Sequence, residues 1–132
     1  APSAVAAMAH EVDLTGLPLR PLQRNIFDLV PEFENQFDYV VEHTCFCAID
    51  PSLRANYVEL VARLLKPQGE LLAVFFTHSR EGGPPYGVTP EGVKALFEPH
   101  FGVESLVPVA NSVPSRRGEE HFGQFRTRKM VR

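Results

Sequence analysis

The spacing of hydrophobic and polar positions along the chain, together with capping signals and helix-forming residues, predicts three helices. Asp50-Pro51 and Thr89-Pro90 each place a capping side chain directly before a proline, the arrangement that suits the first turn of a helix. Apolar residues at a spacing of three and four then predict an amphipathic helix over 51–66, and a second over about 90–98. Good helix formers over Ser3 to Val12 predict a third, N-terminal helix.

Other segments predict strands. Leu71 to Phe76 is six consecutive apolar residues, too short for a helix, and therefore predicts a strand buried on both faces. Phe37 to Val41 predicts a second buried strand in the middle of a sheet. Pro21 to Ile26 predicts a short edge strand, because proline cannot donate to a strand ladder. Val103 to Val109 and His121 to Arg128 predict a closing antiparallel pair.

Helix and strand alternate first and two strands close the chain, which predicts an α/β fold. Its mixed sheet should hold parallel strands near 37–42 and 71–76. The 132 residues, of which 44% are hydrophobic and 22% charged, fit one domain over 1–132.

Composition excludes several classes of partner. A net charge of −3 gives no basis for nucleic-acid binding, and no apolar run reaches the roughly 18 residues that span a membrane. The N-terminus lacks the basic start and apolar core of a signal peptide. Cys45 and Cys47 are too close on a predicted strand to bond with each other. We therefore expect a cytoplasmic protein with reduced cysteines.

The segment Glu42-His-Thr-Cys-Phe-Cys47 follows a predicted buried strand, where open α/β sheets place ligand sites. If this segment is extended, His43, Cys45 and Cys47 share one face and could hold zinc or copper, although a fourth protein ligand is missing. Alternatively, Cys45 could be a nucleophile activated by His43 or His78. In a third interpretation both cysteines are small buried apolar residues.

Several short segments together resemble class I S-adenosylmethionine-dependent methyltransferases, in particular the thiopurine and thiol/halide methyltransferase group. In chain order they are Gln23-Arg-Asn-Ile-Phe27, Glu42-His-Thr-Cys-Phe-Cys-Ala-Ile49, Leu65-Lys-Pro-Gln-Gly69, Gly82-Gly-Pro-Pro-Tyr86, Arg116-Arg-Gly118 and Phe122-Gly-Gln-Phe125. Gln68 stands where the family has a glycine. Each segment is short, but their common order covers nearly the whole chain. The resemblance implies a Rossmann-like class I methyltransferase sheet, truncated at the N-terminus with the first two strands missing.

The resemblance also implies a cofactor, S-adenosylmethionine. Asn25, Ile26 and Phe27 would lie at its adenine, with Asn25 at the family's acidic position, and Glu42 would lie near its amino group. The family's glycine-rich loop and ribose-binding acid are not in this chain. We therefore expect the cofactor to belong to a parent protein and to bind this chain alone weakly or not at all.

By the same resemblance, the parent protein transfers a methyl group to a small soft nucleophile, such as a thiol, a halide or a related sulfur or metalloid species. Such an in-line displacement needs little proton transfer and depends on holding donor and acceptor in a desolvated pocket. His43 would be the catalytic residue that positions the acceptor, and Phe46 and Tyr86 would form pocket walls. In the alternative, His43 is a strand-end histidine hydrogen-bonded to solvent.

A second hypothesis is not enzymatic: a truncated half-fold that acts as a dimeric structural or small-ligand-binding module. Without the family's first strands, the segment 37–41 has an open apolar edge, which is a template for another chain. We therefore expect a homodimer through this edge, unless the segment 1–14 folds back and covers it.

Overall fold

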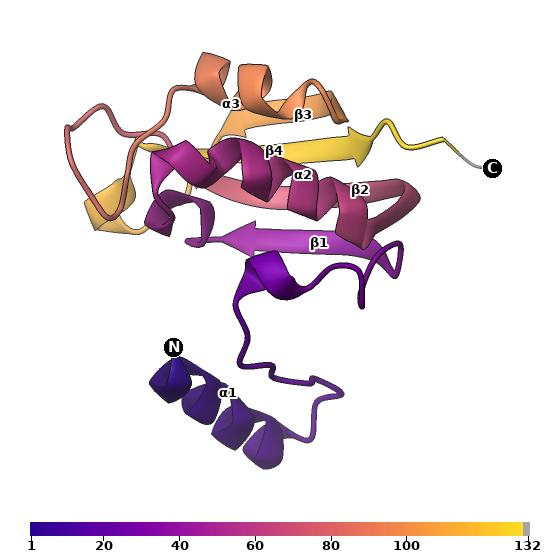
Figure 1. Cartoon of the computed structure of the whole chain (residues 1–132). Coiled ribbons are helices and arrows are strands. Elements are labelled where there is room, and N and C mark those ends of the chain that lie inside the picture. The colour runs from indigo at the N-terminus through magenta and orange to yellow at the C-terminus, as the bar shows by residue number, and fades with distance from the viewer. Residues whose placement is uncertain (131–132) are drawn as a thin grey trace.

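The computed structural model describes residues 1–130 and is built on a four-stranded sheet (Figure 1). The strands are β1 (Phe37–His43), β2 (Leu65–Phe76), β3 (Phe101–Pro108) and β4 (Glu120–Thr127). Their order in the sheet is β1-β2-β4-β3. β1 runs parallel to β2, whereas β4 is antiparallel to both β2 and β3. The predicted mixed sheet, with a parallel pair and an antiparallel C-terminal pair, is confirmed.

Two helices, α2 (Arg54–Leu64) and α3 (Pro90–Phe97), cover one face of this sheet (Figure 1). The predicted cap Thr89 starts α3, whereas the predicted cap Asp50 starts a 3₁₀ turn and α2 begins only at Arg54. Asp50 Oδ1 accepts a hydrogen bond from Ser52 N at 2.9 Å, and Thr89 Oγ1 accepts one from Gly92 N at 2.9 Å. This 3₁₀ turn, η3 (Pro51–Leu53), leads directly into α2, so the local chemistry fixed the start of α3 and the start of the turn before α2.

The core lies between the sheet and these two helices and is rich in aromatic rings. Its fully buried phenylalanines come from every layer of the fold: Phe46, Phe75, Phe97, Phe101 and Phe125. Ring centroids lie 5.5 Å apart for Phe75 and Phe97, and 5.2 Å apart for Phe97 and Phe125. Burying one such side chain is worth about 1.5–3 kcal/mol, so these five rings contribute strongly to the stability of the fold.

One predicted strand, Pro21 to Ile26, is absent, and one strand boundary is wrong. Residues 16–25 form no regular helix or strand, and a 3₁₀ turn, η1 (Ile26–Asp28), stands where the edge strand was expected to end. A strand needs a hydrogen-bonded neighbour, and the two prolines of this segment lack donors. β2 starts at Leu65, six residues earlier than expected, because Leu65 is already extended and pairs with Phe37.

The expectation that β2 is buried on both faces is also wrong, and β1, predicted in the middle of the sheet, lies at its end. On the face away from α2, Tyr39 is 59% exposed and Val41 76% exposed, and their neighbours Leu72 and Val74 are only partly buried. The reason is that α2 and α3 lie on one side, while on the other side no helix or strand within residues 1–130 covers Tyr39, Val41, Leu72 and Val74. We call this uncovered side the open face.

The N-terminal helix α1 (Pro2–Thr15) forms as predicted but has no buried residue. It lies beyond β1, on the side away from β2 (Figure 1). The alternative in which this segment folds back over the edge of β1 is therefore contradicted. Within residues 1–130, no helix is both long and apolar enough to cross a membrane.

Candidate functional site

The chain turns sharply at the carboxyl end of β1. The strand ends at His43, and Thr44 follows with a φ of 64°. A β-branched residue rarely adopts this left-handed conformation, which costs about 1–2 kcal/mol. Such strain persists only where the surroundings fix it and is common at functional sites. The turn continues into a 3₁₀ segment, η2 (Phe46–Ala48).

Glu42 holds this turn in place. Its side chain is buried, with 3% of the residue exposed. Its Oε1 accepts hydrogen bonds from Phe46 N and from the hydroxyl of Tyr57, both at 2.7 Å, and its Oε2 accepts one from Cys45 N at 3.2 Å. A buried carboxylate needs such donors, and hydrogen bonds to a charged group are stronger than neutral ones. Burial and the Glu42 charge together raise the pKa of Tyr57 well above its usual range, so the phenol keeps its proton.

Glu42 and His43 point to opposite sides of the sheet. Glu42 pairs with Ala73 on the face covered by α2, and His43 pairs with Val74 on the open face. The His43 ring is exposed and makes no hydrogen bond within residues 1–130. The structure therefore shows both residues at the carboxyl end of β1 but does not bring them together. Their roles, cofactor contact for Glu42 and acceptor positioning for His43, stay predictions.

The loop over residues 82–87 closes onto the turn after β1. Tyr86 N donates a hydrogen bond to the carbonyl of Cys47 at 2.7 Å. An Nη of Arg54 donates to the carbonyl of Gly87 at 3.0 Å, and its guanidinium lies 4.8 Å from the centroid of the Phe46 ring. The segments that carry Phe46 and Tyr86 are thus brought together. Phe46 itself is 2% exposed, inside the aromatic core, and no observation tests its contact with an acceptor.

The side chain of His78 holds the same loop through hydrogen bonds to its backbone. It is buried, and its Nδ1 accepts a hydrogen bond from Arg80 N at 3.2 Å. Nε2 therefore carries the proton and donates to the carbonyl of Pro85 at 2.9 Å. Both ring nitrogens are used, and the backbone carbonyl of His78 leaves no room for a side chain at Gly87. His78 is a structural residue of this loop.

Neither chemical alternative for the cysteines has support in the geometry. The bend at Thr44 takes Cys45 and Cys47 off the strand, and residues 1–130 contain no group of three His, Cys, Asp or Glu side chains that could hold a metal. Burial raises the pKa of both free thiols. A reactive cysteine needs a lowered pKa, so the interpretation as small apolar residues fits best, with Cys47 buried and Cys45 partly buried.

Sequence reasoning missed a cluster of arginines beside this turn. The Arg116 guanidinium lies 4.2 Å from the centroid of the Phe76 ring, and its positive charge lowers the pKa of Cys47 against the effect of burial. Arg80 lies 5.6 Å from the same ring and pairs with Glu119 at 2.6 Å. The segment Arg116-Arg-Gly118 was the available signal, but only the fold brings it to the carboxyl end of β2.

The expected cofactor segment forms a separate region. Asn25 Oδ1 accepts a hydrogen bond from Phe27 N at 3.0 Å and caps η1. Ile26 and Phe27 are partly buried against the core. Asn25 also lines a hollow of about 330 Å³ together with Ala1, Pro2, Val5, Leu22, Gln23 and Arg24. No hydrogen bond within residues 1–130 joins this segment to Glu42 or His43, so the predicted cofactor contacts stay untested.

Comparison with known proteins decides the family. A sequence model of the family described as Thiopurine S-methyltransferase (TPMT) matches residues 4–131. The chain belongs to this family. It is 37% identical over 93 residues to "Probable thiol methyltransferase 2" of Arabidopsis thaliana, and 34% identical over 103 residues to "Thiocyanate methyltransferase 1" of Brassica oleracea. These matches cover 69% and 76% of the chain, but only 41% of each relative's length.

Solved structures agree on the fold. A 1,6-didemethyltoxoflavin-N1-methyltransferase of Burkholderia thailandensis, solved with S-adenosylhomocysteine bound, has a TM-score of 0.74 at 18% identity and matches 91% of this chain and 56% of its own. A SAM-dependent methyltransferase of Methanosarcina mazei has a TM-score of 0.75 at 14% identity, over 98% of this chain and 79% of its own. The Rossmann-like methyltransferase fold is therefore confirmed for this member of the thiopurine S-methyltransferase family.

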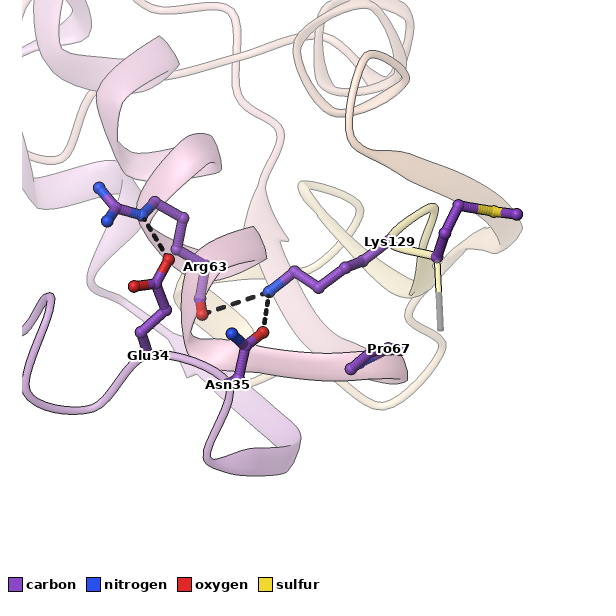
Figure 2. A pocket seen from close by; sticks show the side chains of 6 residues that line it. Glu34, Asn35, Arg63, Pro67 and Lys129 are labelled. Atoms are coloured by element: carbon purple, nitrogen blue, oxygen red, sulfur yellow. Dashed lines mark hydrogen bonds and ion pairs between the residues drawn. The ribbon is translucent and has the colours of Figure 1, made fainter. Parts of the chain in front are cut away.

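A hollow at the opposite end of the sheet is lined by Glu34, Asn35, Arg63, Pro67, Lys129 and Met130 (Figure 2). It lies at the amino end of β1, whereas α/β sheets bind ligands at the carboxyl ends. Its Lys129 amine donates to Asn35 Oδ1 at 2.7 Å and to the carbonyls of Leu65 and Arg63 at 2.7 and 3.3 Å. All three donors of the amine are used, so Lys129 ties the C-terminal segment to the end of α2.

Proposed function

We propose that this chain is the acceptor-side part of an S-adenosylmethionine-dependent methyltransferase whose acceptor is a small soft nucleophile, such as a thiol, a halide or thiocyanate. One observation carries the proposal: the strained turn at Thr44, held by Glu42 and closed by the loop 82–87. This turn lies at the carboxyl end of β1, next to the parallel strand β2, where α/β sheets place their ligands.

The chemistry of the turn fits such a reaction. S-adenosylmethionine supplies a methyl group on a positively charged sulfur, and the acceptor displaces that sulfur in line. This displacement needs orientation and exclusion of water more than acid–base groups, and the turn offers a fixed backbone beside aromatic side chains. In this proposal His43 and Tyr86 contact the acceptor, and Phe46 supports the turn from the core.

Charge supports the acceptor class. Arg54, Arg80 and Arg116 lie on or beside the loop and the turn. Arg80 pairs with Glu119 and Arg116 with Glu120, whereas Arg54 has no ion-pair partner within residues 1–130, and an unpaired cation raises the local concentration of anions. Thiolates, halides and thiocyanate are anions. The names of the relatives, a thiol and a thiocyanate methyltransferase, point to the same class.

The cofactor region of this chain fits only part of S-adenosylmethionine. The Asn25 side-chain amide keeps its NH₂ donors free, since only its oxygen is used in capping η1, and these donors suit an adenine nitrogen. The residues that would bind the ribose and the carboxylate are not found in this chain.

We therefore expect no binding of S-adenosylhomocysteine to this chain below roughly millimolar concentration in a calorimetric titration. A millimolar dissociation constant corresponds to a binding free energy of about −4 kcal/mol. A dissociation constant in the micromolar range would contradict this view of the cofactor site.

The acceptor side can be tested separately by NMR titration of the labelled chain with sodium thiocyanate, with sodium fluoride at equal ionic strength as the reference. We expect amide shifts concentrated in residues 43–48 and 82–87. Arg116→Gln should weaken thiocyanate binding about tenfold or more, the effect of losing one charge-assisted contact worth roughly 1.5–3 kcal/mol, and Arg128→Gln should not. Shifts spread evenly over the surface, or equal binding by both variants, would refute the acceptor site.

A further inference from the structure

His78 is a buried, titratable side chain that the proposed displacement does not use. It stands two residues after the end of β2, and the residue is 5% exposed. Its ring lies edge to face with the ring of Phe76, with centroids 4.6 Å apart. A buried polar ring is costly unless its nitrogens are hydrogen-bonded. The partners of these two nitrogens therefore indicate what the residue does.

The two ring nitrogens hold different parts of the loop. Nδ1 accepts a hydrogen bond from Arg80 N at 3.2 Å, only two residues along the chain, so this contact is local. Nε2 donates to the carbonyl of Pro85 at 2.9 Å, seven residues along the chain. Of the two bonds, only the Nε2 bond spans the loop and joins the end of β2 to the segment that carries Tyr86.

That segment is held against the turn after β1. Tyr86 N donates to the carbonyl of Cys47 at 2.7 Å. An Nη of Arg54 donates to the carbonyl of Gly87 at 3.0 Å. A Cβ at Gly87 would lie 2.8 Å from the Nδ1 atom of His78, so only glycine lets the loop approach the ring this closely. The position of Tyr86 relative to the turn therefore depends on the ring of His78.

We propose that His78 positions the loop 82–87 for the acceptor, through the bond from its Nε2–H to the carbonyl of Pro85. This inference rests on the proposed function, in which Tyr86 contacts the acceptor. His78 acts through the chain, because it fixes Pro85 and Pro85 directly precedes Tyr86. A loop that is already ordered loses less conformational freedom when a ligand binds, and an in-line displacement depends on such orientation. Losing the Nε2 bond should thus weaken acceptor binding although no group that contacts the acceptor is removed.

Two substitutions separate the two nitrogens. His78→Gln places an amide NH₂ near the position of Nε2 and keeps a donor for Pro85. His78→Asn places an amide oxygen near the position of Nδ1, which keeps an acceptor for Arg80 N but leaves nothing that reaches Pro85. In the NMR titration of the whole chain with sodium thiocyanate, His78→Asn should raise the dissociation constant about fivefold, the effect of losing one neutral hydrogen bond. His78→Gln should stay within about twofold of the unchanged chain, because it keeps that hydrogen bond.

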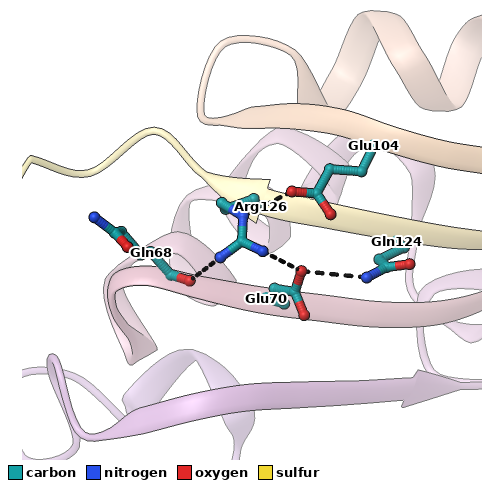
Figure 3. Close-up of polar contacts among 5 residues, drawn as sticks. All are labelled: Gln68, Glu70, Glu104, Gln124 and Arg126. Atoms are coloured by element: carbon teal, nitrogen blue, oxygen red, sulfur yellow. Dashed lines mark hydrogen bonds and ion pairs between the residues drawn. The ribbon is translucent and has the colours of Figure 1, made fainter.

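The charge network at the other end of the open face supplies the matched control (Figure 3). Its members are Gln68, Glu70, Glu104, Gln124 and Arg126. Arg126 donates to Glu104 at 2.7 Å and to Glu70 at 2.8 Å, and it also donates to the carbonyl of Gln68 at 2.9 Å. Gln124 donates to the same Glu70 carboxylate at 3.2 Å.

Gln124→Ala therefore also removes one side-chain hydrogen bond, but away from the loop, since Gln124 pairs with Leu72. Its affinity for thiocyanate should equal that of the unchanged chain. An equal loss of affinity in Gln124→Ala and His78→Asn would show that binding follows only the general stability of the fold, and would overturn the proposal.

Two measurements without ligand test the positioning role directly. The Tyr86 amide, which donates to the carbonyl of Cys47, should exchange with solvent faster in His78→Asn than in His78→Gln, because local opening exposes it. Long-range proton–nitrogen spectra of the unchanged chain should show the His78 proton on Nε2. A proton on Nδ1, or equal exchange of the Tyr86 amide in the two variants, would overturn the proposal.

The outcomes separate this inference from the proposed function. If the unchanged chain does not bind thiocyanate but Tyr86 exchanges faster in His78→Asn, the acceptor site is refuted and the positioning of the loop by His78 is supported. If the unchanged chain binds thiocyanate and the two His78 variants bind it equally well, the role of His78 is overturned and the acceptor site stands.

Discussion

The two faces of the sheet carry similar numbers of apolar side chains but differ in what covers them. On the face beneath α2 and α3, Phe75 and Phe125 are fully buried and their rings lie 5.8 Å apart. On the open face, Val74 and Phe122 are also paired across the same two strands, yet Phe122 is 36% exposed. The apolar side chains alone would therefore predict burial of both faces. The packed structure shows that helices of the chain cover only one of them.

The two faces should differ most in how much a phenylalanine-to-alanine substitution lowers the free energy of unfolding. Phe97→Ala removes a fully buried ring that contacts Phe46, Phe75 and Phe125 and should cost about 3–5 kcal/mol. Phe122→Ala, on the open face, should cost less than about 1 kcal/mol, since a partly exposed ring loses little burial. Urea denaturation of the two variants at one protein concentration measures both values. Comparable losses would mean that the open face is covered under the conditions of the experiment.

A smaller loss of stability should distinguish two tyrosines. Tyr57 lies on the covered face of the sheet, and Tyr39 lies on the open face. Tyr57→Phe removes the hydroxyl that donates to the buried Glu42 carboxylate at 2.7 Å, and hydrogen bonds to charged groups are worth about 1.5–3 kcal/mol. Tyr39→Phe is the matched control, because Tyr39 is 59% exposed and its hydroxyl makes no hydrogen bond in residues 1–130. Thermal unfolding should show a loss only for Tyr57→Phe. If the two variants are equally stable, Glu42 does not depend on Tyr57 for its support.

The tyrosine pair also shows what could be predicted from the sequence. Local chemistry was sufficient for the caps at Asp50 and Thr89 and for the central strand at Leu71 to Phe76, because each signal lies within a few neighbouring residues. The Glu42 network was not predictable in this way. It depends on Tyr57, which is 15 residues away in the chain and comes close only when α2 packs on β1.

The errors have a similar physical origin. The strand expected over Pro21 to Ile26 had suitable apolar residues, but a strand forms only where a neighbour supplies hydrogen bonds, and none of the described elements does so. Burial of β2 on both faces was inferred from its continuous apolar run, which is a property of the sequence. Whether a second layer covers Leu72 and Val74 is decided by elements elsewhere in the chain or by a partner.

The smallest expected effect lies at the polar end of the open face, in the turn that leads into the paired part of β2. Gln68 has a φ of 64°. In the methyltransferase turn that the segment Leu65 to Gly69 resembles, a glycine stands at this position. The left-handed conformation costs a residue with a Cβ about 1–2 kcal/mol, while glycine loses about 0.5–1 kcal/mol through its greater freedom in the unfolded chain. Gln68→Gly should therefore stabilise the protein by about 0.5–1 kcal/mol, or roughly 2–4 °C in melting temperature. The carbonyl that accepts from Arg126 is kept, so the charge network should not change.

Gln23→Gly, at an exposed position without a positive φ, is the matched control and should be neutral or slightly destabilising. A lower melting temperature for Gln68→Gly would show that the Gln68 side chain stabilises the turn through a contact worth more than the backbone strain that it imposes.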